Sequence, residues 1–386
     1  MTDVSVRAGL VGVAVGSAVL LGACSQGPGE AARSPAPPVA DLTWRRVALP
    51  DSLAPVTLAT TGERILIGAF GPGRPRPHLL VGADATSLRE VPLTPRSPYA
   101  FEAHWFGITT RGDRIDAIAG ARGGAHGNYR WSTWSGDTKG VAEQEQPFGV
   151  FGSYGAGDLA GIAYAGDAPV VLGAWQSQQT GMDVATWSRT GDRWARVPST
   201  GTPLASTPQE LADARVVTAR GDGLLVGGSV THLAPGSVEV EPVAWSAPGP
   251  SGPWTRFGLP RTGDSGTSEV QGARCTGDRC LLTGVTDGHL SVWKVDAGTH
   301  GEPAGIPAVE IPENGSVPSP VTLDGDDVVV APTGTGSTVL RRDGDSWATA
   351  RGPSGTPTSV VAHGDELWVV TSDARGSTTL WRARVA

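Results

Sequence analysis

A two-residue turn recurs seven times along this chain, and it constrains the fold more than any other feature. In each copy a short apolar run ends at the turn and a second apolar run begins directly after it. The seven turns are Gly62-Glu63, Gly112-Asp113, Gly166-Asp167, Gly221-Asp222, Gly277-Asp278, Gly325-Asp326 and Gly364-Asp365. Consecutive turns lie 39 to 56 residues apart, counted from Gly325 to Gly364 and from Gly221 to Gly277. The chain is therefore expected to repeat one small β unit seven times.

Each repeat carries the pattern of a four-stranded sheet. The second run is almost continuously apolar, as in residues 170–173 and 281–284, and strands covered on both faces have that composition. A third run often contains a Trp-Ser pair such as Trp187-Ser188, and a fourth often opens with another tryptophan such as Trp194. The 55 glycines and 31 prolines among 386 residues supply the turns that short strands need. The sequence predicts an all-β, seven-bladed β-propeller, with six or eight blades as alternatives because the pattern is weakest in residues 104–148.

The seventh repeat provides three strands, expected at residues 359–362, 367–371 and 378–383. A fourth is available near the other end of the chain, where residues 43–50 read like the fourth strands of other repeats. A ring closed in this way has no free sheet edge. We therefore expect the N-terminal strand to complete the last blade.

The tryptophans recur at the period of the repeat, which favours packing between neighbouring blades over ligand stacking. The turn between the third and fourth strands in residues 187–194, WSRTGDRW, resembles a degenerate Asp-box, the Ser-x-Asp-x-Gly-x-Thr-Trp turn of sialidase-like propellers. Residues 342–347 are a second partial match that lacks the leading serine, and the first has Thr190 in place of the aspartate and is one residue short. Asp-boxes stabilise turns remote from catalysis, so the resemblance implies architecture only.

Cys275 and Cys280 flank the Gly277-Asp278 turn. If this is a two-residue hairpin turn, the two cysteines form a directly opposed, non-hydrogen-bonded pair with close Cα atoms, a geometry that suits a disulfide. A metal site is the alternative, but two thiolates with no second pair or nearby histidine fall short of four zinc ligands. A disulfide implies an oxidising compartment.

The N-terminal region has the layout of a signal peptide, with Arg7 ahead of a small-residue apolar stretch at residues 8–21. Fourteen helical residues span about 21 Å, short of the ~30 Å hydrocarbon core of a membrane. The run Leu20-Leu21-Gly22-Ala23-Cys24 resembles the lipobox of bacterial lipoproteins. That resemblance implies a signal peptide at residues 1–23, lipidation of Cys24 (palmitate included), and attachment to the extracytoplasmic face of the cell membrane. An ordinary cleaved signal peptide is the alternative.

Residues 25–41 are rich in Gly, Pro, Ala and Ser and hold one larger apolar residue, Val39. We expect residues 24–41 to form a lipid-anchored, disordered tether and residues 42–386 to form the propeller domain. The formal net charge of −8 argues against nucleic acid or anionic lipid as a direct partner.

No sequence pattern identifies a catalytic site. The chain has no Gly-x-Ser-x-Gly elbow, phosphate loop or His-Glu-x-x-His, so we predict no cofactor and no metal and assign no catalytic residue. The acidic run at residues 324–327 coincides with a repeated turn, which favours a hairpin over a calcium site. None of the four tyrosines has a context that matches the tyrosine nucleophile of sialidases. The chain is therefore less favoured as an enzyme than as a binding module.

The connections in the first four repeats are longer and carry more recognition-type side chains than those in the last three. Propeller loops of this kind meet at one mouth of the central channel, where rigid blades hold variable loops. The candidate binding residues are Arg74, Arg76, His78, Tyr99, Glu102, His104, Arg122, His126, Tyr129, Phe148, Phe151, Tyr154, Trp175 and Gln176. The sequence predicts a binding or scaffold module for a protein or a cell-envelope glycan, with a sialidase-like or other glycan-directed hydrolase as the alternative.

Overall fold

The computed structural model of the protein describes residues 42–123, 127–262 and 266–384. Within these ranges it has 29 strands and two single-turn 3-10 helices, η1 (Pro50–Ser52) and η2 (Ala100–Glu102). The expected signal peptide, the lipobox cysteine Cys24 and the tether lie outside the described residues.

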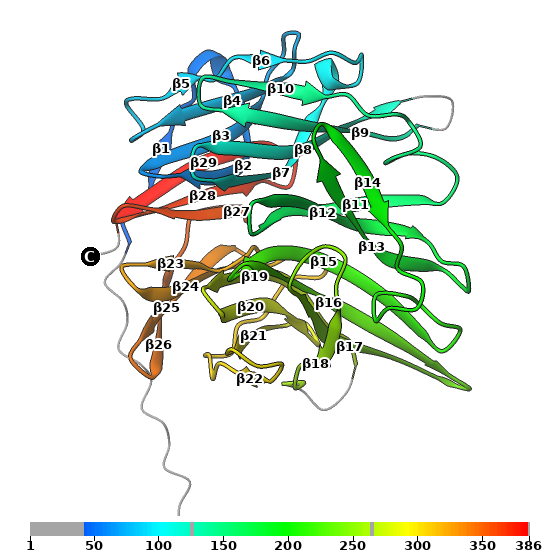
Figure 1. Cartoon of the computed structure of the whole chain (residues 1–386). Coiled ribbons are helices and arrows are strands. Elements are labelled where there is room, and N and C mark those ends of the chain that lie inside the picture. The colour runs from blue at the N-terminus through cyan, green and yellow to red at the C-terminus, as the bar shows by residue number, and fades with distance from the viewer. Residues whose placement is uncertain (1–41, 124–126, 263–265, 385–386) are drawn as a thin grey trace, which may run out of the picture. The chain divides into compact units, whose positions relative to one another are not determined.

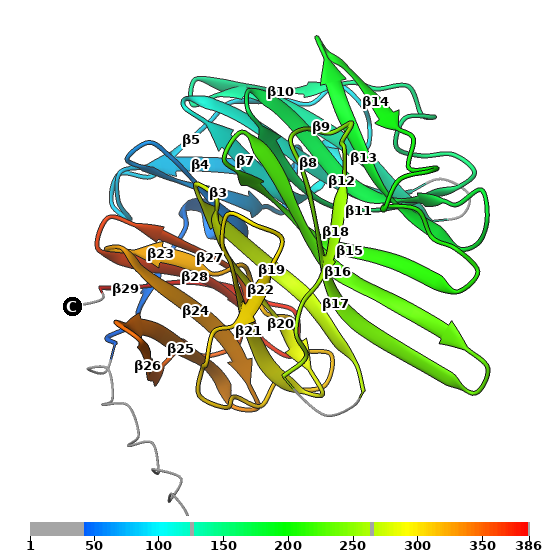
Figure 2. The ribbon, with the colours of Figure 1, turned by 60° about the horizontal axis from the view of Figure 1, so that its bottom comes forward.

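The strands form seven sheets in chain order, which confirms the predicted seven-bladed β-propeller (Figure 1, Figure 2). The first blade contains β2 (Ala54–Thr61), β3 (Arg64–Phe70), β4 (Pro77–Gly82) and β5 (Arg89–Glu90). The second contains β7 (His104–Arg111), β8 (Arg114–Gly123), β9 (Asn128–Asp137) and β10 (Gly140–Gln144), with β6 (Leu93–Thr94) added in parallel to β10. The third contains β11 (Ala156–Ala165), β12 (Ala168–Gln176), β13 (Met182–Thr190) and β14 (Arg193–Val197).

The remaining blades repeat the same meander. The fourth contains β15 (Glu210–Arg220), β16 (Gly223–Ala234), β17 (Ser237–Ala247) and β18 (Thr255–Gly258). The fifth contains β19 (Ser268–Thr276), β20 (Arg279–Thr286), β21 (His289–Val295) and β22 (Gly301–Pro303). The sixth contains β23 (Val321–Leu323), β24 (Asp326–Thr333), β25 (Gly336–Asp343) and β26 (Ser346–Arg351). The seventh contains β27 (Thr356–His363), β28 (Glu366–Ser372), β29 (Thr378–Arg384) and the N-terminal strand β1 (Arg45–Val47).

The ring closes between the two ends of the described chain. Strand β1 pairs antiparallel with β29, with Arg46 opposite Trp381 and Val47 opposite Leu380. Figure 1 shows the blue β1 beside the red β29. The expected closure of the last blade by the N-terminal strand is therefore confirmed.

Apolar side chains between neighbouring blades form the core. The described residues form seven buried clusters, and each contains residues of two adjacent blades, including one that joins Ile65 of the first blade to Trp368 of the seventh. The third-strand tryptophans Trp187, Trp245 and Trp293 are almost fully buried. Each donates its indole N–H to a carbonyl in the connection that enters its blade, at 2.8 to 2.9 Å. The periodic tryptophans therefore pack the blades together, as predicted.

A buried ionic network supplements apolar packing between the second and third blades. Asp116 on β8 has no exposed surface and pairs with Arg189 on β13, with 2.5 Å between Oδ1 and Nη1. The hydroxyl of Tyr164 on β11 donates to the same carboxylate. Burial, followed by the hydrogen bond to Asp116 and its charge, raises the pKa of Tyr164 well above its usual range. This network therefore fixes one blade against the next.

Six of the seven predicted turns are two-residue hairpins at the expected positions. The sixth-blade prediction was wrong by one residue, because Leu323 pairs with Asp326 and the turn is Asp324-Gly325. Both turn residues have positive φ, 51° and 90°, which an Asp-Gly pair accommodates in a type I′ turn. Asp326 then pairs with Arg341, consistent with a hairpin in the acidic run.

The Cys275–Cys280 disulfide is present, as predicted. The two cysteines are opposed in the β19–β20 hairpin with 4.0 Å between their Cα atoms. The disulfide therefore links the two strands of the hairpin close to the Gly277-Asp278 turn.

Candidate functional site

The meander gives the ring two different faces. Strands within a blade alternate in direction, so the connections between blades and the hairpins between second and third strands share one face, here called the connection face. The short Gly-Asp turns are on the opposite face. The described segments that contain predicted binding residues belong to the connection face.

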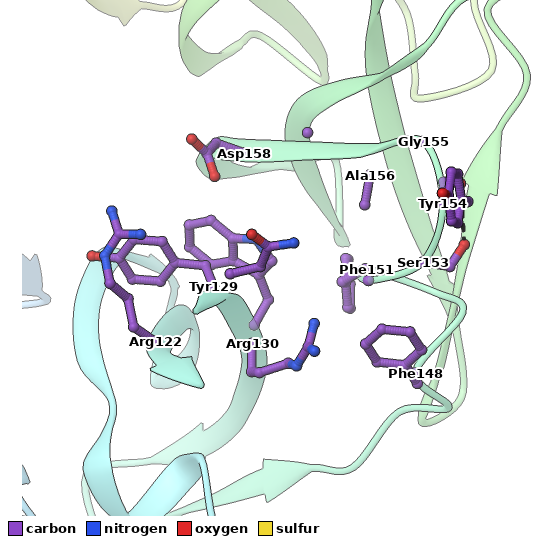
Figure 3. Close-up of a pocket in the computed structure, with 14 residues that line it drawn as sticks. Arg122, Tyr129, Arg130, Phe148, Phe151, Ser153, Tyr154, Gly155, Ala156 and Asp158 are labelled. Atoms are coloured by element: carbon purple, nitrogen blue, oxygen red, sulfur yellow. Dashed lines mark hydrogen bonds between the residues drawn. The ribbon is translucent and has the colours of Figure 1, made fainter. Parts of the chain in front are cut away.

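A cleft of about 800 Å³ lies on the connection face between the second and third blades (Figure 3). We call it the aromatic cleft. Its lining comes from the β8–β9 hairpin, from the connection between β10 and β11, and from the start of β11. Five of the predicted binding residues line it: Arg122, Tyr129, Phe148, Phe151 and Tyr154. Its volume is in the range of small-ligand sites.

Two aromatic rings form one wall of the aromatic cleft, and a third ring packs against them. Tyr129 and Trp131 are two residues apart on β9 and therefore on the same side of the sheet. Their ring centroids are 5.3 Å apart and their planes differ by 21°. Phe106 of β7 packs edge-on against both rings. The register of β7 shifts between Trp105 and Gly107, which leaves Phe106 unpaired at a bulge and its side chain 43% exposed.

The connection from β10 to β11 combines one buried ring with two exposed ones. Phe151 is 5% exposed and packs against Trp187 and Trp194, so it anchors the connection. Phe148 is 57% exposed and Tyr154 fully exposed. The connection is anchored at its centre and presents aromatic rings on either side.

Glycines let this connection fold as it does. Gly155 has φ +96°, which L side chains rarely adopt. A Cβ on Gly152 would lie 2.8 Å from the Phe148 ring. The backbone N–H of Gln176 donates to the Gly155 carbonyl at 2.7 Å, which supports the segment after Tyr154.

The aromatic cleft contains charged groups without ionic partners. The Arg122 guanidinium lies 4.6 Å from the Tyr129 ring centre, and that of Arg130 lies 4.7 Å from the Phe148 ring centre. Among the described residues, neither arginine has a carboxylate oxygen within 4.0 Å. Asp158 likewise has no cationic nitrogen within 4.0 Å among these residues. Figure 3 shows Asp158 on the opposite side of the cleft from Arg130.

The predicted residues of the first blade and its exit form a separate group. Glu102 pairs with both Arg74 and Arg76, and the Arg76 guanidinium lies over the Phe70 ring. The His104 ring stacks on the same Phe70 ring, with 3.6 Å between the ring centroids. Burial, with a smaller contribution from the Arg76 charge, lowers the pKa of His104. Both arginines of this group therefore share one carboxylate partner within it.

The other predicted residues have mainly supporting positions. His78 pairs with Glu90 through Nδ1 and Oε1 at 2.6 Å. Tyr99 lines a smaller hollow of about 190 Å³ that shares Arg130 and Phe148 with the aromatic cleft. Trp175 packs edge-on against Trp187 beneath the Arg196 guanidinium. His126 lies outside the described residues.

Sequence analysis missed a second site on the connection face, a cleft of about 920 Å³ that we call the polar cleft. Arg215 of β15 pairs with Asp213 at 2.8 Å and with Glu269 of β19 at 3.8 Å. The Gln271 amide donates to Glu269 at 2.5 Å and accepts from the Val317 backbone N–H. Desolvation raises the pKa of Asp213; the Glu269 charge acts in the same direction and Arg215 opposes both.

A repeated backbone irregularity places acidic residues at equivalent points of three consecutive inner strands. In each of these strands a β-bulge interrupts the pairing, and the acidic residue lies two positions before the bulged residue. The three acidic residues are Asp158, Asp213 and Glu269. In each blade the opposing strand has a glycine at that point. A Cβ on Gly228, for example, would overlap the Asp213 carbonyl oxygen. The repeated glycine near the end of the second apolar run was the available sequence signal.

The described residues offer neither a metal-ligand cluster nor a membrane-spanning helix. Within the described ranges, no three His, Cys, Asp or Glu side chains are grouped so that they could hold a metal ion. No helix in that part of the chain is long and apolar enough to cross a membrane.

The chain is similar to several solved structures, and the first one described supports the fold. The β-propeller domain of Myceliophteria thermophila Cps50 (Swd1) is 9% identical, with 86% of this chain and 97% of that one covered and a TM-score of 0.51. A Trypanosoma rangeli sialidase mutant displaying trans-sialidase activity is 12% identical, covering 90% and 60%, with a TM-score of 0.45. The PQQ-bound aldose sugar dehydrogenase of Streptomyces coelicolor is 17% identical, covering 72% and 93%, with a TM-score of 0.40. No protein-family model and no curated protein matches the sequence.

Proposed function

We propose that this protein is a membrane-tethered, extracytoplasmic β-propeller that binds a cell-envelope ligand, a glycan or a protein, in the aromatic cleft. The observation that carries the proposal is the meeting of exposed aromatic rings and unpaired guanidinium groups in one cleft. Tyrosine, tryptophan and arginine dominate the binding energy of recognition sites. Rigid blades on both sides hold these side chains in place before a ligand arrives.

The exposure of Phe148 and Tyr154 supports a binding role. By contrast, Trp187 and Trp245 are buried between blades. Exposed apolar surface costs about 25 cal/mol per Å² relative to its burial. A ligand that covers both rings recovers part of that free energy.

The membrane attachment rests on the lipobox-like run that ends at Cys24. The Cys275–Cys280 disulfide supports an oxidising, extracytoplasmic compartment. Metabolic labelling with a palmitate analogue should mark the wild-type protein and leave the Cys24→Ser variant unmarked. Equal labelling of both would contradict lipidation at this cysteine.

A thermal-shift panel of cell-envelope glycans and proteins tests the binding site. A ligand at a hundredfold excess over its Kd stabilises the folded state by about 2.7 kcal/mol. We expect the Phe148→Ala/Tyr154→Ala variant to lose this shift. Val238→Ala removes an exposed apolar side chain from the fourth blade and should retain the shift. An identical shift in all three proteins would place the ligand elsewhere.

The polar cleft supports a second candidate, a glycan-directed hydrolase. Asp213 and Glu269 approach the same Arg215, and the raised pKa of Asp213 suits a proton donor. One carboxyl group would protonate the leaving oxygen while the other activates water. Turnover of an envelope glycan that Asp213→Asn and Glu269→Gln abolish would support this candidate, whereas turnover unaffected by either would exclude it.

A further inference from the structure

The aromatic cleft holds its two arginines in a way that leaves their donor groups available. A guanidinium that lies over an aromatic ring uses one planar face, and its N–H groups remain at the edge. Arg130 lies over Phe148 and makes no further hydrogen bond among the described residues. Arg122 lies over Tyr129 and donates one bond, to the Gly127 carbonyl at 3.3 Å.

These donors match a carboxylate. A guanidinium presents two parallel N–H groups at the spacing of the two carboxylate oxygens, and such charge-assisted pairs are roughly twice as strong as neutral ones. Figure 3 shows the Arg130 guanidinium directed into the space between the Tyr129 and Phe148 side chains. A carboxylate at this point would lie beside aromatic surface, which is suited to the apolar face of a sugar ring.

The opposite wall imposes a second requirement. Asp158 is exposed, accepts hydrogen bonds and donates none when ionised. It suits ligand hydroxyl groups and disfavours a second anionic group nearby. A ligand with closely spaced negative charges is therefore disfavoured.

We propose that the aromatic cleft binds an acidic glycan whose carboxylates are separated by neutral sugars, with a ring carboxylate on Arg130 and ring hydroxyls on Asp158. This rests on the proposed function, because it names the ligand class of the same cleft. An acidic peptide is the rival occupant, and it is an outcome of the test.

Calorimetric titration of the full chain in a mild detergent tests the ligand class with three probes. These are a tetrasaccharide of alternating glucuronate and N-acetylglucosamine, its methyl ester, and the neutral N-acetylglucosamine tetramer. We expect the acidic form to bind roughly 10- to 100-fold more tightly than the ester. The affinity of the acidic form should also fall when the salt concentration is raised from about 50 mM to about 500 mM, because the screening length then shortens from about 14 Å to about 4 Å.

Arginine variants locate the carboxylate. Arg130→Ala should weaken the acidic probe roughly 10- to 100-fold and change binding of the ester by less than about threefold. Arg130→Lys keeps the charge but loses the paired donors, so it should lie between wild type and alanine. Arg196→Ala is the matched control, because Arg196 lies over Trp175 at the same 4.7 Å and does not line the cleft. It should leave both affinities unchanged.

The outcomes separate the inference from the function on which it rests. Equal binding of acidic, esterified and neutral probes, lost in Phe148→Ala/Tyr154→Ala, would overturn carboxylate recognition and keep the cleft as a glycan site. Failure of all three probes, or tight binding of an acidic peptide alone, would overturn the acidic-glycan inference. The thermal-shift panel then decides independently whether the cleft binds any ligand.

Discussion

Replacement of Asp116 by asparagine tests whether the buried ionic network holds the second blade against the third. Asparagine keeps the shape of the side chain and removes its charge. Arg189, whose side chain is 9% exposed, then remains as a buried cation without its partner. Removing one member of a buried ion pair costs about 3–5 kcal/mol, because the remaining charge stays desolvated.

The size of the thermal effect follows from the length of the propeller. The entropy of unfolding is about 2.1 cal/mol/K per residue, so about 340 ordered residues give roughly 0.7 kcal/mol/K. A loss of about 3–5 kcal/mol then lowers the unfolding midpoint by about 4–7 °C. Differential scanning calorimetry measures this shift directly.

Asp167→Asn provides the matched control for Asp116→Asn. Asp167 also pairs with an arginine, Arg111, at 3.1 Å, but its side chain is 85% exposed. Exposed ion pairs contribute about 0–1 kcal/mol, so the midpoint should change by no more than about 1 °C. If the two variants lost the same stability, the argument from burial would be refuted. Combining Asp116→Leu with Arg189→Met should restore much of the loss, because no buried unpaired charge remains; Arg114, which also lies 3.7 Å from Asp116, is 48% exposed.

Three further perturbations test other parts of the structure. Val47→Asp puts a charge at the buried position of β1 and should cost about 2–4 kcal/mol by calorimetry, whereas Arg45→Asp on the same strand is exposed and should be nearly neutral. Replacing Cys275 and Cys280 by alanine opens a very short loop and should lower unfolding stability by about 2 kcal/mol or less, an effect that reduction of the wild type should reproduce. The raised pKa of Asp213 means that the folded state binds its proton more tightly than the unfolded state, so wild-type stability should fall as pH rises through the carboxyl range. Asp213→Asn should flatten this part of the stability–pH curve, and an unchanged curve would contradict the assignment.

The blade architecture could be predicted because its determinants are local. A Gly-Asp turn between two apolar runs specifies a hairpin without reference to other blades, and its sevenfold recurrence gives the blade number. The cysteine pair shows the same point, because the turn at Gly277 alone brings Cys275 opposite Cys280. The one-residue error at Gly325 arose because Asp-Gly and Gly-Asp turns lie adjacent in that acidic run.

The sites were less accessible to sequence reasoning because residues from different blades build them. Phe106 is exposed at a bulge where it has no strand partner, and an isolated phenylalanine in the sequence gives no sign of that. Arg74 and Glu102 were both selected as recognition residues, but the fold pairs them with each other. Asp213 and Glu269 are 56 residues apart in sequence, and only the stacking of two blades brings both to Arg215.

Pairing of β1 with β29 also has a consequence for the order of folding. The partners Arg46 and Trp381 are separated by 335 positions, so their contact has a very high contact order. Closing a flexible loop of that length costs about 5 kcal/mol of chain entropy if no intervening structure has formed. The intervening blades should therefore fold first and bring the two ends together, which makes ring closure a late step. Until then the outer edge of β29 is an unpaired template for strand addition, and a chain interrupted before closure would be prone to association with a second copy.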